Sequence, residues 1–498
     1  MKRPISISLL LFFSYFLQAQ NSFSSLYYSS RLKANTASFL PILSEEGLQN
    51  SFLGFTASPL ISYTQSFGES DFDYHSFGFS LAYKGNSKLS FSLDYEKFKG
   101  DQTTFVNNYL EEFHVFPGRG EIEKKGEKYT FKDFNYRIAY NISNHFDLEF
   151  GQSKHFIGDG YRSLLLSDNA FNYPFLRIQT SFWRVQYTNL YAEMQDINYF
   201  ENNGIDHYGY AKKYMSSHYL STNVTSKLNI GIFESVIWRV NHAPGVRGFD
   251  VNYLNPIALF RPLEYSINSP DNALVGINAK YELPLKSYLY GQLVLDEFSL
   301  NEMKSGDDWY GSKYGYQLGA KMYDAIGLEN LTLQAEYNLV RPYTYAHHDP
   351  RQNYAHYNQP LAHPLGANFS EKLFIINYRK DRWVARAQIM IAKYGDKIKG
   401  DPTSFGNDVY MSTGEFEEPS GFIHAGRPSD FGIAIYQGNL TDINYLQLNI
   451  GYLINPATNF KIDFSIVKRD LVSEEQEVNT MFYSIGLKTD LFNHYYDF

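Results

Sequence analysis

Four histidines gather in one segment of the chain and are the first residues to consider for metal chemistry. They are His347, His348, His356 and His363, all within residues 342–368. Neutral imidazole is the commonest metal ligand in proteins, so the group is a candidate metal site. Its spacing matches no helical HExxH arrangement. The alternative is a polar aromatic loop whose imidazoles bond one another, Tyr or backbone groups, and we predict no bound metal.

A second group lies in residues 154–175, KHFIGDGYRSLLLSDNAFNYPF, where Asp159, Tyr161 and Arg162 stand beside glycines and a run of leucines. The stretch GDGYRS lacks the full GxGxxG spacing and the Lys-Ser/Thr of a P-loop, which argues against a nucleotide site. A carboxylate, a ring and a guanidinium together suit carbohydrate, because rings stack on sugar CH groups and planar polar groups bond hydroxyls. We therefore predict these three as ligand-binding residues. The open alternative is an ion pair that serves only packing.

Three further charged residues, Arg247, Arg261 and Glu264, lie in residues 240–271, which mix Gly and Pro turns with an apolar patch. Arg261 and Glu264 are three positions apart, and on one helical turn that spacing allows an ion pair. We predict that the three residues either join the ligand-binding set or brace this segment against residues 154–175.

The sequence gives little support for catalytic activity. Adjacent carboxylates such as Glu111-Glu112 and Asp307-Asp308 are typical of solvated loops. A glycosidase needs two carboxyl groups at a defined separation across a sugar cleft, which a sequence cannot show. No GxSxG elbow is present. We predict no catalytic residue, no enzyme activity and no cofactor.

Composition narrows the class of protein. The 498 residues include no Cys, 43 Tyr and 40 Phe, with a formal net charge of −9. The absence of Cys excludes disulfides, thiolate metal sites and lipid attachment at a Cys. So large an aromatic content is unlike an ordinary globular composition. We expect no nucleic-acid partner.

The first twenty residues, MKRPISISLLLFFSYFLQAQ, have the form of a cleaved signal peptide. Lys2 and Arg3 precede an apolar run from Ile5 to Leu17, and Ala19 is a small residue at the expected cleavage site. The run is too short for a stable membrane helix, and no later run approaches the roughly 20 apolar residues that a spanning helix needs. We expect residues 21–498 to be exported as one domain.

Strict alternation of apolar and polar residues predicts strands with one face of each kind, as in residues 89–96, 331–339 and 460–466. These segments are about ten residues long and have aromatic ends, which favours a transmembrane antiparallel β-barrel with a wet lumen over a soluble β-sandwich. We predict about eighteen strands, near 52–65, 71–84, 88–98, 128–142, 145–153, 174–182, 184–195, 216–226, 228–239, 272–283, 286–300, 313–323, 330–341, 369–379, 381–394, 440–453, 457–469 and 479–491.

A barrel of eighteen strands is too wide to be filled by the side chains of its own strands. We therefore expect some long connections to fold into the lumen, residues 154–175 above all. Residues 99–127 are predicted to be a solvated loop, with a short helix followed by a charged Gly-rich stretch, and residues 395–431 an exposed loop. The last strand runs toward a C-terminal Phe498 in an aromatic pattern that resembles the signal read by barrel-assembly machinery.

Three blocks of the chain carry a family resemblance: KHFIGDGYRSLLLSDNAFNYPF, RGFDVNYLNPIALFRPLEYSINSPDNALVGINAKY and HYNQPLAHPLGANFSE. They resemble Wzi-type capsule-assembly outer-membrane proteins and, more closely, their RemB-like gliding-motility relatives. The resemblance implies an eighteen-stranded barrel with segments folded into the lumen and no catalytic activity. The small N-terminal helical bundle of the Wzi pattern is not recognisable, which favours the motility branch.

We thus predict a non-enzymatic barrel in the outer membrane of a Gram-negative bacterium. It would support gliding motility or surface adhesion through surface polysaccharide or a partner protein of gliding or secretion machinery. The alternatives are a Wzi-type capsule polysaccharide attachment protein and a porin-like diffusion channel.

Overall fold

A computed structural model describes most of the chain after residue 54. It covers residues 36–38, 55–68, 71–84, 88–202, 208–242, 245–246, 248–255, 271–296, 307–418, 421–489 and 495–498. The expected signal peptide lies outside these residues. Among the described helices, none is long and apolar enough to cross a membrane.

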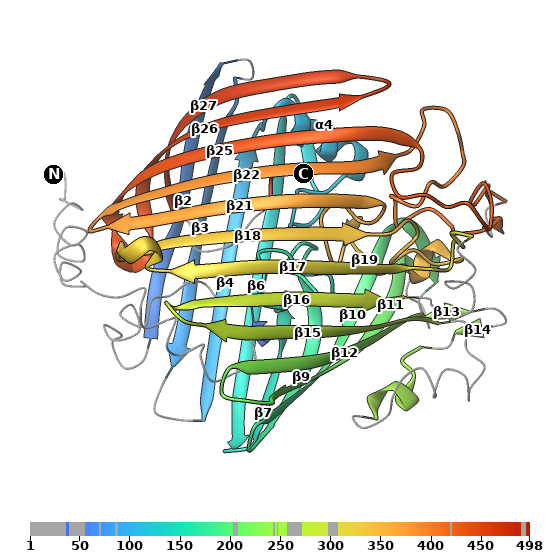
Figure 1. The fold of residues 1–498 in the computed structure, drawn as a ribbon, viewed down its shortest axis with the longest axis horizontal. Coiled ribbons are helices and arrows are strands. Elements are labelled where there is room, and N and C mark those ends of the chain that lie inside the picture. The colour runs from blue at the N-terminus through green and yellow to red at the C-terminus, as the bar shows by residue number, and fades with distance from the viewer. Residues whose placement is uncertain are drawn as a thin grey trace, which may run out of the picture.

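Eighteen long strands close into one antiparallel barrel, each paired with the next along the chain and the last with the first (Figure 1). A short strand, β5 (Glu123–Lys125), adds to β6. The long strands are β2 (Phe55–Gly68), β3 (Asp73–Lys84), β4 (Leu89–Gly100), β6 (Lys128–Ser143), β7 (Phe146–Ser153), β9 (Tyr173–Phe182), β10 (Val185–Asn202), β11 (Tyr208–Asn223), β12 (Leu228–Arg239), β15 (Asn272–Leu283), β16 (Ser287–Leu295), β17 (Tyr314–Tyr323), β18 (Leu331–Val340), β21 (Phe369–Lys380), β22 (Trp383–Asp396), β25 (Asn439–Asn455), β26 (Phe460–Ser473) and β27 (Glu477–Thr489). The predicted fold class is confirmed.

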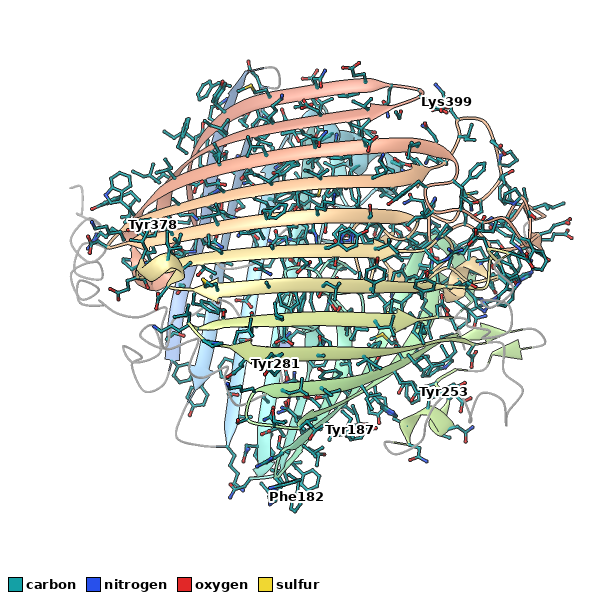
Figure 2. All side chains as sticks on the ribbon, in the orientation of Figure 1. Phe182, Tyr187, Tyr253, Tyr281, Tyr378 and Lys399 are labelled. Atoms are coloured by element: carbon teal, nitrogen blue, oxygen red, sulfur yellow. The ribbon has the colours of Figure 1, made fainter. Side chains whose placement is uncertain are left out.

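The two ends of the barrel differ in the length of their connections. One end, the turn end, carries tight links such as Phe182 to Val185 and Lys380 to Trp383. The other, the loop end, carries the long segments. Phe182 and Tyr378 lie toward the turn end and Lys399 at the loop end (Figure 2). Outer-membrane barrels keep short turns in the periplasm and long loops outside the cell, which orients the molecule.

Alternation along each strand separates an apolar exterior from the interior, as β21 shows. Its residues Glu371 and Leu373 point inward and are fully buried, whereas Phe374 and Ile376 point outward and are nearly half exposed. Outward apolar residues recur on the neighbouring strands. A closed barrel leaves no unpaired sheet edge, so a wall with this apolar exterior is suited to lipid. The chain is an outer-membrane β-barrel.

Ile450 on β25 tests this assignment, because it points outward and lies five residues from the turn end. Ile450→Arg is expected to lower the unfolding free energy of the barrel in lipid by about 2–4 kcal/mol relative to Ile450→Ala, since lipid does not solvate a guanidinium. Urea unfolding in vesicles measures the difference. Equal stability of the two variants would contradict a lipid-facing Ile450.

The lumen of the loop half is packed with inserted segments, as expected for residues 154–175, so the expectation of a wet lumen is wrong for this half. One apolar cluster joins residues 154–175 and 345–369 to the wall of β9, β10, β11, β12, β15 and β16. A second surrounds helix α4 (Thr104–Phe113), whose Phe105, Val106 and Leu110 are buried. The short helix expected within residues 99–127 is thus present, but the prediction that this region is solvated is wrong for the helix and for residues 115–120. An amphipathic helix there covers apolar positions on the inner wall.

Candidate functional site: a plug in the barrel lumen

Three segments meet inside the barrel and are called the plug here: residues 154–172, residues 342–368 and the C-terminal residues 495–498. The first leaves β7 and forms the short strand β8 (His155–Ile157), which pairs with β1 (Thr36–Ser38). It then crosses the interior before it joins β9. This confirms that segments of the chain fold into the lumen.

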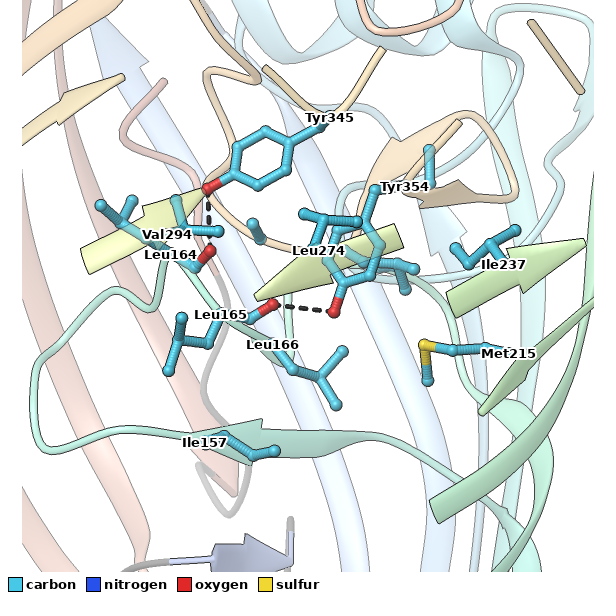
Figure 3. Packing of buried hydrophobic residues seen from close by; sticks show 14 of the residues in the cluster. Ile157, Leu164, Leu165, Leu166, Met215, Ile237, Leu274, Val294, Tyr345 and Tyr354 are labelled. Carbon is cyan, nitrogen blue, oxygen red and sulfur yellow. Dashed lines mark hydrogen bonds between the residues drawn. The ribbon is translucent and has the colours of Figure 1, made fainter. Parts of the chain in front are cut away.

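The three leucines of the first segment form the apolar centre of the plug. Leu164, Leu165 and Leu166 are all fully buried (Figure 3). Tyr345 donates its hydroxyl to the carbonyl of Leu164 and Tyr354 to that of Leu165, both at 2.8 Å. Burying a leucine stabilises by about 1.5–3 kcal/mol, so this run holds the first two plug segments together.

Arg162 lies where the first plug segment, the C-terminal plug segment and the barrel wall meet. Its Nη2 is 3.0 Å from Glu371 Oε1 on β21 and 2.8 Å from Asp497 Oδ2. The guanidinium also stacks over the rings of Tyr161 and Tyr495, at 5.1 and 4.8 Å. Two carboxylates and two ring faces around a buried cation offset the large cost of removing it from water.

The backbone next to Arg162 is fixed by Glu336 on β18. The amides of Tyr161 and Arg162 donate to the two carboxylate oxygens of Glu336 at 2.8 and 3.1 Å. Gly160 allows this approach, because a Cβ there would lie 2.5 Å from Glu336 Oε2. The glycine is thus explained by contact with the wall rather than by a phosphate site.

Asp159 is anchored to another part of the wall. Its carboxylate accepts from Lys280 Nζ at 2.8 Å and from Asn278 Nδ2 at 3.0 Å, both on β15. Asp159 and Arg162 are buried and Tyr161 is partly buried. The structure therefore brings the three predicted residues together, with the packing contacts that the sequence left open. Carbohydrate binding by them stays a prediction.

The C-terminal residues turn into the lumen and leave the sheet (Figure 1). β27 ends at Thr489, close to the predicted limit of 491, and residues 495–498 lie inside the barrel. The hydroxyl of Tyr495 donates to Asp168 Oδ1 at 2.6 Å, and Arg469 Nε donates to the carbonyl of Phe498 at 3.1 Å. Phe498 is not the end of the last strand, which corrects that expectation.

The four histidines of the second plug segment have separate surroundings. His363 Nε2 is 2.9 Å from Glu371 Oε2, and His348 packs its ring on Phe416. His347 interacts with the backbone of Asp349. Within the described part of the chain, no group of three or more His, Asp or Glu could hold a metal ion.

His356 ties the second plug segment to β10. Its Nδ1 accepts from the amide of Gln195 at 3.0 Å, and its Nε2 is 3.3 Å from the carbonyl of Asn172. Burial lowers the pKa of His356 to about 3, so the ring is neutral and serves as acceptor on one nitrogen and donor on the other. His356 therefore fits the alternative to a metal site, in which the imidazoles bond backbone groups.

The remaining predicted residues, Arg247, Arg261 and Glu264, lie outside the described residues. The described part of their segment includes the 3-10 turn η2 (Val251–Leu254), which packs on the outer wall of the barrel instead of entering the lumen. The predicted roles of Arg247, Arg261 and Glu264 therefore stay a prediction.

Sequence reasoning missed the residues that hold Arg162 and Asp159, namely Glu336, Glu371, Asp497 and Lys280. Glu336 stands on the polar face of a predicted strand, which indicates an inward position. Nothing in the sequence indicates which inward carboxylate meets which plug residue.

Comparison with known proteins gives information about the fold only. No family model and no curated protein matches the chain. Among solved structures, the outer membrane protein OprD from Pseudomonas aeruginosa is similar with 11% identity and a TM-score of 0.43, over 93% of this chain and 98% of that one. OccAB2 from Acinetobacter baumannii is similar with 8% identity and a TM-score of 0.43, over 87% and 96%. At this level of similarity, function has to be argued from the molecule's own geometry.

Proposed function

We propose that the protein is a porin-like outer-membrane channel, without catalytic activity, whose plug closes the lumen to free diffusion. The observation that carries the proposal is the change in the inner wall along the barrel axis. Toward the loop end, inward apolar residues such as Leu373 and Met390 pack on the plug, and an inward charged group such as Glu371 is paired with it. Toward the turn end the inward residues are polar, as at Asp463, which lies 2.6 Å from Lys488 Nζ.

A polar inner wall supports water, and the bonds that hold the plug to the wall, most of them from side chains, are separate from the hydrogen bonds that close the barrel. Arg162 illustrates this, since its ion pairs with Glu371 and Asp497 join elements outside the sheet to the wall. The plug can therefore move while the strands stay paired. The solutes that pass would be small and polar, because the turn half is lined by ionised groups.

Leu165→Glu is expected to open the lumen. The wild-type protein in a planar bilayer should show little conductance, whereas a carboxylate at a fully buried leucine expels the segment and raises conductance severalfold. Leu165→Met, which conserves volume, is the control. A large steady conductance of the wild-type protein contradicts a closed plug. If the folded barrel does not conduct with either Glu or Met at position 165, the proposal of a channel is wrong.

A second candidate is a non-conducting surface protein of gliding or capsule attachment, which rests on the resemblance of the plug segments to RemB-like and Wzi-type proteins. The packed lumen supports it. Polysaccharide would then contact exposed residues of the long loops, such as Phe422 and Phe431, rather than the buried Arg162. Deletion of the gene should impair gliding or capsule retention. Unchanged spreading and unchanged capsule together would remove this candidate.

A further inference from the structure

A segment at the loop end, residues 248–254, packs against the outside of the barrel and is called the outer strap here. Trp238 Nε1 donates to the carbonyl of Gly248 at 3.2 Å, and Ser216 Oγ donates to that of Tyr253 at 2.8 Å. Trp238 and Ser216 point outward, since their neighbours Ile237 and Met215 point inward and pack on the plug. In Figure 1 the strap helix η2 lies outside the strands.

A groove runs between the outer strap and the wall formed by β6, β7, β9, β10 and β11. Its volume is about 310 Å³, within the roughly 300–1,000 Å³ that ligand sites occupy. Its lining is mainly aromatic, and Phe249 of the strap lies 5.2 Å from the ring of Tyr214. Its lining includes the aromatic residues Tyr136, Phe150, Tyr191, Tyr214 and Phe249, with Pro174 beside them and one carboxylate, that of Glu193.

The groove faces the membrane in its outer half. Tyr191 lies six residues from the start of β10 at the turn end. At a tilt near 40°, a strand rises on the order of 2.5 Å per residue, which places Tyr191 about 15 Å into an apolar band of about 25 Å. Lys212 lies two positions beyond the level of Tyr214, at the outer rim of the groove, where it forms an ion pair with Glu193 at 2.8 Å.

We propose that the groove binds an acyl chain of the lipopolysaccharide of the outer leaflet, clamped by Phe249, with its headgroup at the outer rim. Water does not fill an apolar groove at this depth, and only lipid is available there. Rigid rings on both sides of the groove hold one chain in place. The site is independent of whether the lumen conducts.

Native mass spectrometry of the full-length protein, released from outer membranes in a mild detergent, tests the proposal. The wild-type barrel is expected to keep one lipopolysaccharide adduct. Phe249→Ala removes the clamp and Pro174→Trp fills the groove, so each should reduce the bound fraction about tenfold. Ile450→Ala removes an outward side chain on the far wall and should leave the adduct unchanged.

Each possible result of this experiment leads to a different conclusion. Heat-modifiable gel migration shows that each variant is folded, so a lost adduct is not a lost barrel. An adduct of equal abundance in all four proteins, or none in the wild type, overturns the site. A phospholipid adduct that responds to Phe249→Ala overturns the assignment to the outer-leaflet lipid.

Discussion

Replacing Arg162 with alanine is expected to destabilise the plug by about 3–5 kcal/mol, the usual effect of removing one partner from a buried ion pair. The variant leaves Glu371 and Asp497 facing each other without their cation, and both are almost fully buried. The wall is not expected to open, because its strands keep their hydrogen bonds. The effect should therefore appear in residues 154–172 and in the conductance.

Hydrogen–deuterium exchange of peptides from residues 154–172 measures this effect. Exchange should accelerate about a hundredfold or more in the variant, while peptides from β25 and β26 stay protected. Conductance should rise with it. If exchange in the plug is unchanged, Arg162 is not what holds the plug.

Arg386 offers a matched control. It is also an inward arginine, and it lies 5.3 Å from the ring of Tyr161, but it is only partly buried. It donates to the amide oxygens of Asn377 and Gln388. Arg386→Ala should cost about 1 kcal/mol, since no buried carboxylate loses its counterion. An equal effect of the two substitutions would show that Arg162 acts through ring contacts alone.

The strands could be predicted because lipid and interior impose opposite demands on alternate residues. All eighteen predicted strands are present in order, and the largest error is at β10 and β11. β10 extends to Asn202 and β11 begins at Tyr208, against predicted limits near 195 and 216. Beyond the membrane the alternation ends, but hydrogen bonding between the two strands continues.

The plug could be predicted only in part. Gly, Asp and Arg beside a leucine run indicated an inserted segment, and the width of the barrel required one. The partners of that segment lie far along the chain, since Arg162 and Glu371 are 209 residues apart. The outer strap could not be predicted for the same reason, since its partners on the wall are not evident from the sequence. Residues 248–254 carry the Gly and Asp of an ordinary loop.

The second large effect on plug stability is expected from changes at the C-terminal end of the chain. Removing residues 495–498 is expected to leave assembly intact, because β27 is complete at Thr489 and pairs with both β26 and β2. The truncated plug should lose about 2–4 kcal/mol, since the buried Arg162 keeps Glu371 but loses Asp497 and the ring of Tyr495.

Asp497→Asn separates this role from a role in assembly. It preserves the length of the chain and Phe498, and it removes only the charge beside Arg162. Both variants should reach the outer membrane at wild-type levels and show faster exchange in residues 154–172. If truncation abolishes assembly while Asp497→Asn does not, the terminal aromatic residues are read by the assembly machinery before they enter the lumen. The tail would then act first as a signal and only later as part of the plug, because one segment cannot occupy both places at once.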